Sequence, residues 1–226
     1  MRAVACAVAI LVAAALPVSS AGAQDWAARC TQDIEKGNIE ACRKAVAEEP
    51  KNPVLRRHYA RAMTFRGLYQ SAIDQYRIIT GIRPAEARSW YDYGYALAFV
   101  RRYKESIQPL EKAVEINRSY VAALRILAIA YAKEKKPAMV FRATLAMAGI
   151  GDRIAQFEVS IFYQEAYGVG RNFVKSLQWL VKAAEAGHIG AMDRLVRVYQ
   201  NGGLGQAKND RKAEFWAIQA RRARLN

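Results

Sequence analysis

The feature that most constrains the fold is a repeat with a fixed period. Segments rich in helix-favouring residues begin at Pro53, Ala87 and Val121, each 34 residues after the one before. Short breaks such as Arg66-Gly67 and Lys135-Lys136-Pro137 divide these segments into pairs of helices. A single helix pair cannot bury its own apolar face, so successive pairs must stack on one another. The period therefore predicts an all-α chain of stacked antiparallel helix hairpins.

The residues inside this period resemble the tetratricopeptide repeat. The middle repeat matches that family's W-x-x-L-G-x-x-Y motif at Trp90, Tyr93, Gly94 and Leu97. The flanking repeats keep further positions of the family pattern at Ala72, Tyr76 and Pro84 and at Leu124, Leu127, Ala128 and Tyr131. The resemblance covers residues 53–150 and implies three repeats of a right-handed α-solenoid. Pro109 departs from the motif and can bend the second helix of the middle repeat.

From Asp152 onward the repeat changes in kind. Tyr163 and Tyr199 are 36 residues apart, whereas Trp179 and Trp216 are 37 residues apart, so the second copy has one extra loop residue. The first copy resembles the Sel-one-like repeat, a relative of the tetratricopeptide unit, through Gly168-Val169, Lys175, Trp179, Lys182-Ala183-Ala184-Glu185 and Gly187-His188. This resemblance implies two further helix hairpins over residues 152–226.

Three loop positions depart from the Sel-one-like pattern. Ala166 stands where the first loop glycine of that family is expected, and Asn172 and Asn209 stand where the family usually has aspartate. We expect the helices to form as in the family. The geometry of the two loops stays open.

Residues 1–23 have the pattern of a secretory signal peptide. Arg2 precedes an apolar run over residues 4–16, and Ala21-Gly22-Ala23 forms an A-x-A cleavage site. The run is shorter than the roughly 20 apolar residues that a membrane-spanning helix needs. We therefore expect an exported protein, periplasmic or secreted, whose mature chain begins at Gln24. An uncleaved membrane anchor is the alternative.

Two cysteines, Cys30 and Cys42, remain once the signal peptide and its Cys6 are removed. Lys36-Gly37-Asn38 favours a turn midway between them, so two antiparallel helices would bring the pair side by side. In an exported protein this arrangement predicts a disulfide within an N-terminal capping hairpin over residues 24–51. Two buried free thiols are the alternative.

Residue patterns for catalysis are weak in this chain. Its two histidines, His58 and His188, lie in different repeats, and neither accompanies a serine or cysteine in a known nucleophile pattern. No cluster of metal ligands remains once the cysteines are paired. The tryptophans at matching repeat positions are predicted to pack in the core, with ligand-binding aromatic residues as the alternative: Trp90, Trp179 and Trp216. We therefore expect no enzymatic activity, no cofactor and no metal.

Binding along one face is the function that the pattern favours. In the tetratricopeptide family, fixed positions of each first helix line the concave groove of the solenoid. The resemblance assigns these positions to Arg57, Arg61, Phe65, Arg88, Tyr91, Tyr95, Phe99 and Arg125. Tyr and Arg are enriched at binding hot spots, and Arg pairs with carboxylates. We expect a peptide or protein ligand with acidic and apolar residues; a solvated basic face is the alternative.

The net charge of +15 favours anionic partners. Nucleic acid is not expected, because the chain has neither zinc-finger spacing nor an RNA-binding sheet motif. Together with the alanine-rich signal, the resemblances predict a non-catalytic protein–protein interaction adaptor of the bacterial cell envelope. The first alternative is a binder of an anionic cell-wall polymer or lipid surface. The second is a hydrolase.

Overall fold

The computed structural model describes residues 21–32 and 39–225, and these residues form twelve helices and no strand. The helices are α1 (Ala21–Gln32), α2 (Ile39–Glu48), α3 (Pro53–Phe65), α4 (Tyr69–Ile82), α5 (Ala87–Phe99), α6 (Tyr103–Ile116), α7 (Val121–Lys133), α8 (Pro137–Gly149), α9 (Arg153–Glu165), α10 (Phe173–Glu185), α11 (Ile189–Asn201) and α12 (Asp210–Leu225). The apolar run of the predicted signal peptide and the predicted turn over residues 36–38 lie outside the described residues. The predicted cleavage position after Ala23 falls in the first turn of α1.

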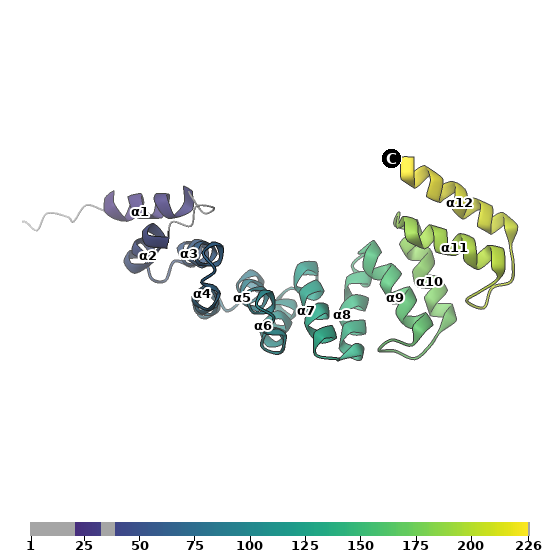
Figure 1. Cartoon of the computed structure of the whole chain (residues 1–226), viewed down its shortest axis with the longest axis horizontal. Coiled ribbons are helices and arrows are strands. Elements are labelled where there is room, and N and C mark those ends of the chain that lie inside the picture. Colours follow the sequence, from purple (N-terminus) through teal and green to yellow (C-terminus); the bar gives the residue numbers. More distant parts are fainter. Residues whose placement is uncertain (1–20, 33–38, 226) are drawn as a thin grey trace, which may run out of the picture.

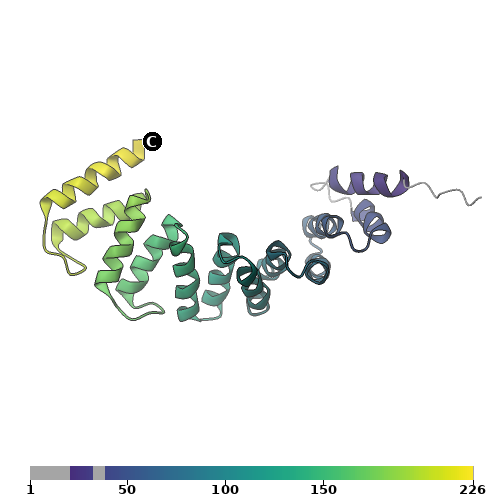
Figure 2. The same cartoon turned by 180° about the vertical axis from the view of Figure 1, so that it is seen from behind.

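The helices stack as hairpins along an arc. Helices α3, α5 and α7 begin at Pro53, Ala87 and Val121, so the 34-residue period sets where each hairpin starts. Each helix packs on the next in sequence, and α5 also contacts α7. Figures 1 and 2 show α1 and the C-terminal end of α12 on the open side of the arc. Helices α3 to α6 are seen nearly end on and α7 to α11 from the side, so the stack twists along its length. The predicted all-α solenoid is confirmed.

Close helix packing depends on small side chains at the crossing points. A Cβ atom added to Gly94 on α5 would lie 2.6 Å from Leu110 Cγ on α6. Ala60, Ala113 and Ala123 are fully buried between neighbouring helices. Pro109 is buried inside α6, and the helix runs without interruption from Tyr103 to Ile116.

A disulfide links the first two helices. Cys30 on α1 and Cys42 on α2 form the predicted bond, with their Cα atoms 4.5 Å apart. Both cysteines are buried and pack against Leu55 and Ala62 on α3. The first hairpin therefore covers the apolar side of α3, as an N-terminal cap must.

The two C-terminal repeats use the same asparagine caps. Asn172 Oδ1 accepts the Lys175 N–H at 2.9 Å, and Asn209 Oδ1 accepts the Lys212 N–H at 3.0 Å. The N–H of each asparagine also donates to a tyrosine carbonyl at 2.8 Å, that of Tyr163 or Tyr199. Asparagine thus performs the capping that aspartate could perform at these positions.

The loop after α9 has an unusual backbone conformation. Ala166 adopts the left-handed region with φ of 58°. The equivalent residue of the second copy is Gly202, with φ of 74°. Two residues later, a Cβ atom on Gly168 would lie 2.1 Å from the Pro137 carbonyl oxygen, so this loop passes directly over the start of α8. A glycine is required at 168, whereas Ala166 bears strain that a glycine would avoid.

Candidate functional site

The predicted groove residues Arg57 and Arg88 are engaged in ion pairs within the protein. Arg57 on α3 donates from Nε to Asp92 Oδ2 at 2.7 Å and from Nη2 to Glu86 Oε2 at 3.3 Å. Arg88 Nε donates to the other Asp92 oxygen at 2.7 Å. The Asp92 side chain is only 10% exposed. One buried carboxylate therefore neutralises two arginines and ties α3 to α5.

Arg125 is also paired. Its Nη2 donates to Asp152 Oδ2 at 2.6 Å. The other Asp152 oxygen caps α9 by accepting the N–H groups of Ile154 and Ala155. Arg125 thus joins α7 to α9, so two of the four predicted groove arginines, Arg57 and Arg125, hold neighbouring hairpins together, whereas Arg88 pairs within α5.

The predicted aromatic residues form a continuous strip along α5. Tyr91, Tyr95 and Phe99 follow one another at four-residue spacing, with ring centres 5.8 and 6.4 Å apart. Tyr120 extends this aromatic strip at 5.0 Å from Tyr91, and Tyr69 extends it at 5.4 Å from Phe99. Tyr95 is 44% exposed and Phe99 is 54% exposed. The strip offers a ridge of rings to a ligand.

Two predicted residues on α3 remain open to solvent. Arg61 is exposed, and its guanidinium forms no ion pair within the described ranges. Phe65 is 56% exposed near the end of the same helix. We call the surface made by Arg61, Phe65 and the aromatic strip the inner face, because the family resemblance places these positions on the concave side of the solenoid.

Burial raises the pKa of tyrosines at and near the inner face. It raises the pKa of Tyr91 and Tyr120, and neighbouring Asp92 adds to the effect at both. The same two causes raise the pKa of Tyr76 to about 12. These phenols therefore stay neutral at physiological pH and can donate hydrogen bonds.

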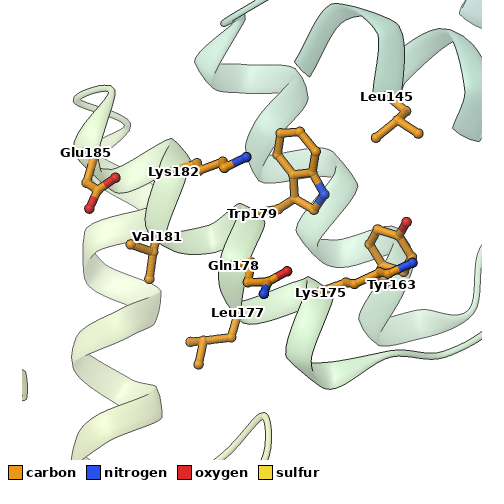
Figure 3. A pocket seen from close by; sticks show the side chains of 9 residues that line it. All are labelled: Leu145, Tyr163, Lys175, Leu177, Gln178, Trp179, Val181, Lys182 and Glu185. Carbon is orange, nitrogen blue, oxygen red and sulfur yellow. The ribbon is translucent and has the colours of Figure 1, made fainter. Parts of the chain in front are cut away.

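A pocket lies on the C-terminal half of the arc, outside the predicted groove. Its volume is about 710 Å³, and most of its lining comes from α10, with one residue each from α8 and α9. The lining residues are Leu145, Tyr163, Lys175, Leu177, Gln178, Trp179, Val181, Lys182 and Glu185. Figure 3 shows Lys175 and Lys182 on either side of the Trp179 indole, with Leu145 beyond it.

Trp179 meets its prediction as a core residue only in part, because it packs against the core of α7 to α9 but is half-buried. Trp216 is buried, whereas Trp90 and Trp179 are half-buried, and Trp179 lines the pocket. The four- and three-residue steps from Lys175 to Trp179 and Lys182 place all three on one helix face, and this signal was available in the sequence. Packing was preferred over binding for Trp179 because the two copies share this position.

Comparison with known proteins places the fold among repeat solenoids. No protein-family model matches the chain. The crystal structure of MamA protein is similar with a TM-score of 0.61 and 19% identity, covering 76% of this chain and 96% of that one. The Sel1 repeat protein from Oxalobacter formigenes is similar with a TM-score of 0.53 and 21% identity, covering 90% and 87%. The chain has the fold of a tetratricopeptide and Sel1 repeat solenoid.

Two further similarities are to proteins described as tetratricopeptide-repeat proteins. YrrB, described as a TPR protein with an unusual peptide-binding site, is similar with a TM-score of 0.54 and 18% identity, covering 83% of this chain and 94% of that one. Small glutamine-rich tetratricopeptide repeat-containing protein 2 of Mycosarcoma maydis is 33% identical over 81 residues. That match takes in 36% of this chain and 23% of the relative, so the chain spans about a quarter of that protein.

Of the two histidines, His188 caps a helix and His58 lies partly buried on α3. His188 Nδ1 accepts the Ala191 N–H at 3.0 Å and so caps α11, and its imidazole stacks on the Phe157 ring at 4.5 Å. His58 Nδ1 is buried on α3 without a hydrogen-bond partner in the described part of the chain. Burial lowers the pKa of both imidazoles.

Two features are absent from the described residues: a cluster of metal ligands and a membrane-spanning helix. No group of three or more His, Cys, Asp or Glu side chains there could hold a metal ion. No helix there is long and apolar enough to cross a membrane.

Proposed function

We propose that the chain is a non-catalytic scaffold that binds a peptide or protein segment on its inner face. The observation that carries this proposal is the aromatic strip on α5, whose rings at Tyr95 and Phe99 remain about half exposed although neighbouring residues of that helix are buried. Exposed aromatic groups on a rigid helix supply large contact area at low entropic cost.

The ion pairs of the predicted groove arginines define the expected ligand more closely. Arg57, Arg88 and Arg125 already have carboxylate partners, so an acidic ligand would have to displace them. Arg61, the fourth groove arginine, is exposed and forms no ion pair within the described ranges. A segment with apolar or aromatic anchors and one carboxylate toward Arg61 fits this face better than a polyacidic tail.

Two further observations support the proposal. The fold resembles that of YrrB, whose description includes a peptide-binding site. The disulfide between Cys30 and Cys42 fits an oxidising compartment, so we propose a place in the cell envelope or outside the cell.

A cross-linking pull-down tests the scaffold function. Wild type and the Tyr95→Ala/Phe99→Ala variant are compared in extracts of the source cells, with Phe215→Ala as the control. Phe215 is exposed to a similar extent, at 51%, but lies on α12. Partners that the wild type and the control recover, and the strip variant loses, support the proposal. Equal recovery by all three proteins contradicts it.

Binding of an anionic surface is a second candidate function, and α12 favours it. Phe215 and Ile218 are exposed on this helix together with Arg211, Arg221 and Arg222. Apolar and basic residues on one exposed helix suit an anionic lipid surface. Cosedimentation with phosphatidylglycerol vesicles that falls steeply with salt would support this function. Equal sedimentation of an Arg211→Ala/Arg221→Ala/Arg222→Ala variant would contradict it.

A further inference from the structure

The pocket on α10 contains two cations that form no ion pair. Lys175 Nζ lies 5.5 Å from the centre of the Tyr163 ring, and Lys182 Nζ lies 4.5 Å from the centre of the Trp179 ring. Both lysines are exposed, and neither ammonium group forms a salt bridge within the described ranges. A cation–π contact at an exposed site is weak, so a ligand carboxylate can draw each ammonium group off its ring. That movement would uncover the aromatic surface.

Comparison with the second Sel1-like copy shows which parts of this arrangement the repeat needs for its packing. It keeps the lysine–tyrosine contact, with Lys212 Nζ 5.2 Å from the centre of the Tyr199 ring. Its tryptophan, Trp216, is only 9% exposed, and Gln219 occupies the place of Lys182. Lys182 is therefore not required to build the repeat, and it stands where the first copy leaves its indole open.

Spacing along α10 limits the shape of the ligand. Lys175 and Lys182 are separated by seven residues, which is about 10 Å along a helix, and Trp179 lies between them. In an extended peptide, alternate residues share one face at about 6.6 Å intervals, so residues i, i+2 and i+4 span about 13 Å. Two flexible lysine side chains can accommodate that difference. The order cation, ring, cation matches a ligand order of acidic, apolar, acidic.

We propose that this pocket binds an extended peptide segment with the pattern acidic–x–apolar–x–acidic, separately from the inner face. The two carboxylates pair with Lys175 and Lys182, and the apolar side chain packs between Trp179 and Leu145. The Gln178 amide, also in the lining, can donate to and accept from a peptide backbone.

Glu185 narrows the choice of ligand. It lines the pocket three residues beyond Lys182 and forms no salt bridge within the part of the chain that is described. Its carboxylate repels a longer run of negative charge. The pocket therefore selects two separated carboxylates and disfavours a uniform polyanion.

Fluorescence polarisation with the labelled peptide Ser-Glu-Ser-Leu-Ser-Glu-Ser tests this proposal on the full chain at low salt. Lys175→Ala and Lys182→Ala should each weaken binding by about three- to fivefold, as for exposed ion pairs. The matched control is Lys212→Ala/Gln219→Ala in the second copy, which should bind like wild type. A peptide with Gln in place of both Glu should bind as weakly to wild type as the Glu peptide binds to the Lys175→Ala/Lys182→Ala variant.

Several outcomes would overturn the proposal. One is equal affinity of wild type and the Lys175→Ala/Lys182→Ala variant, with both shown by circular dichroism to be folded. Another is an equal loss of affinity in the control of the second copy. Tighter binding of oligogalacturonate or inorganic phosphate than of the peptide would show that the pocket prefers a different kind of anion to the proposed peptide. The Tyr95→Ala/Phe99→Ala variant should bind the probe normally, so failure of the scaffold function on the inner face would leave this result unchanged.

Discussion

At the scale of single residues, His188 can cap α11 only while its Nδ1 is unprotonated, because that atom accepts the Ala191 N–H. Burial lowers the pKa of His188, and Arg153 adds to this effect, so the folded value lies below the ordinary value of about 6.5. A lowered folded pKa gives stability that is complete above pH ~6.5 and is lost as the pH falls toward the folded pKa.

We predict that wild type loses up to about 1 kcal/mol of this cap's contribution as the pH falls below about 6.5. His188→Asn keeps a side-chain oxygen that can cap the helix but does not titrate, so its unfolding free energy should vary less with pH. Urea denaturation between pH 7.5 and 5 measures the difference. The pKa of His58 is also lowered, but His58 is present in both proteins, so its contribution cancels in the comparison. Superimposable pH profiles would show that His188 makes no such contribution.

Ala166 offers a second prediction at this scale. It holds a left-handed conformation with φ of 58°, where a Cβ atom costs about 1 kcal/mol. We expect Ala166→Gly to stabilise the protein by about 0.5 kcal/mol in chemical denaturation. The control is Ala186→Gly at the end of α10, where φ is −75° and the same change relieves no strain. Stabilisation by both substitutions would contradict the explanation.

At the scale of helices, Asp92 ties α3 to α5 through Arg57, and it also pairs with Arg88 on its own helix. Asp92→Asn would leave both guanidinium groups without their shared carboxylate, and we expect a loss of about 2 kcal/mol in unfolding free energy. Asp74→Asn is the matched control, because Asp74 pairs with Arg77 on one exposed helix surface at 3.4 Å. That variant should change stability by less than about 0.5 kcal/mol. Equal effects would show that the pairing does not join the hairpins.

Helix positions could be predicted from the sequence more fully than side-chain partners. The starts of α3, α5 and α7 follow from the 34-residue period of this part of the chain, which reflects the stacking of successive hairpins. The pairing of Arg57 could not be predicted in this way, because Asp92 lies 35 residues away on the next hairpin. One sequence shows neither how far neighbouring hairpins rotate nor which carboxylate then faces a given arginine.

The pocket at Trp179 was hidden for a related reason. The sequence shows that Trp179 and Trp216 occupy equivalent positions, but equivalent positions can differ in burial when their neighbours differ. For His188 the sequence shows only that no nucleophile pattern accompanies it, whereas the structure shows that its side chain caps α11.

At the scale of the whole molecule, the disulfide places a covalent constraint at one end of the stack. Cys30→Ser/Cys42→Ser should lower the unfolding free energy by about 3 kcal/mol. This is the loss expected for a disulfide that closes a loop with a sequence separation of 12. In a solenoid each hairpin is stabilised mainly by its neighbours, so the effect should be local. Hydrogen exchange should accelerate in α1 to α3 and stay unchanged in α9 to α11. Acceleration throughout the chain would show that the solenoid unfolds as one cooperative unit.

The opposite end of the stack has no such constraint. Among the described helices, α12 packs mainly on α11, and its last residues include Arg221, Arg222 and Arg224. A trypsin-like protease would therefore find its preferred cleavage sites on the helix with the fewest neighbours. Degradation would then have a direction, with hairpins lost one after another from the C-terminus toward the disulfide, and the pocket on α10 would be destroyed before the inner face.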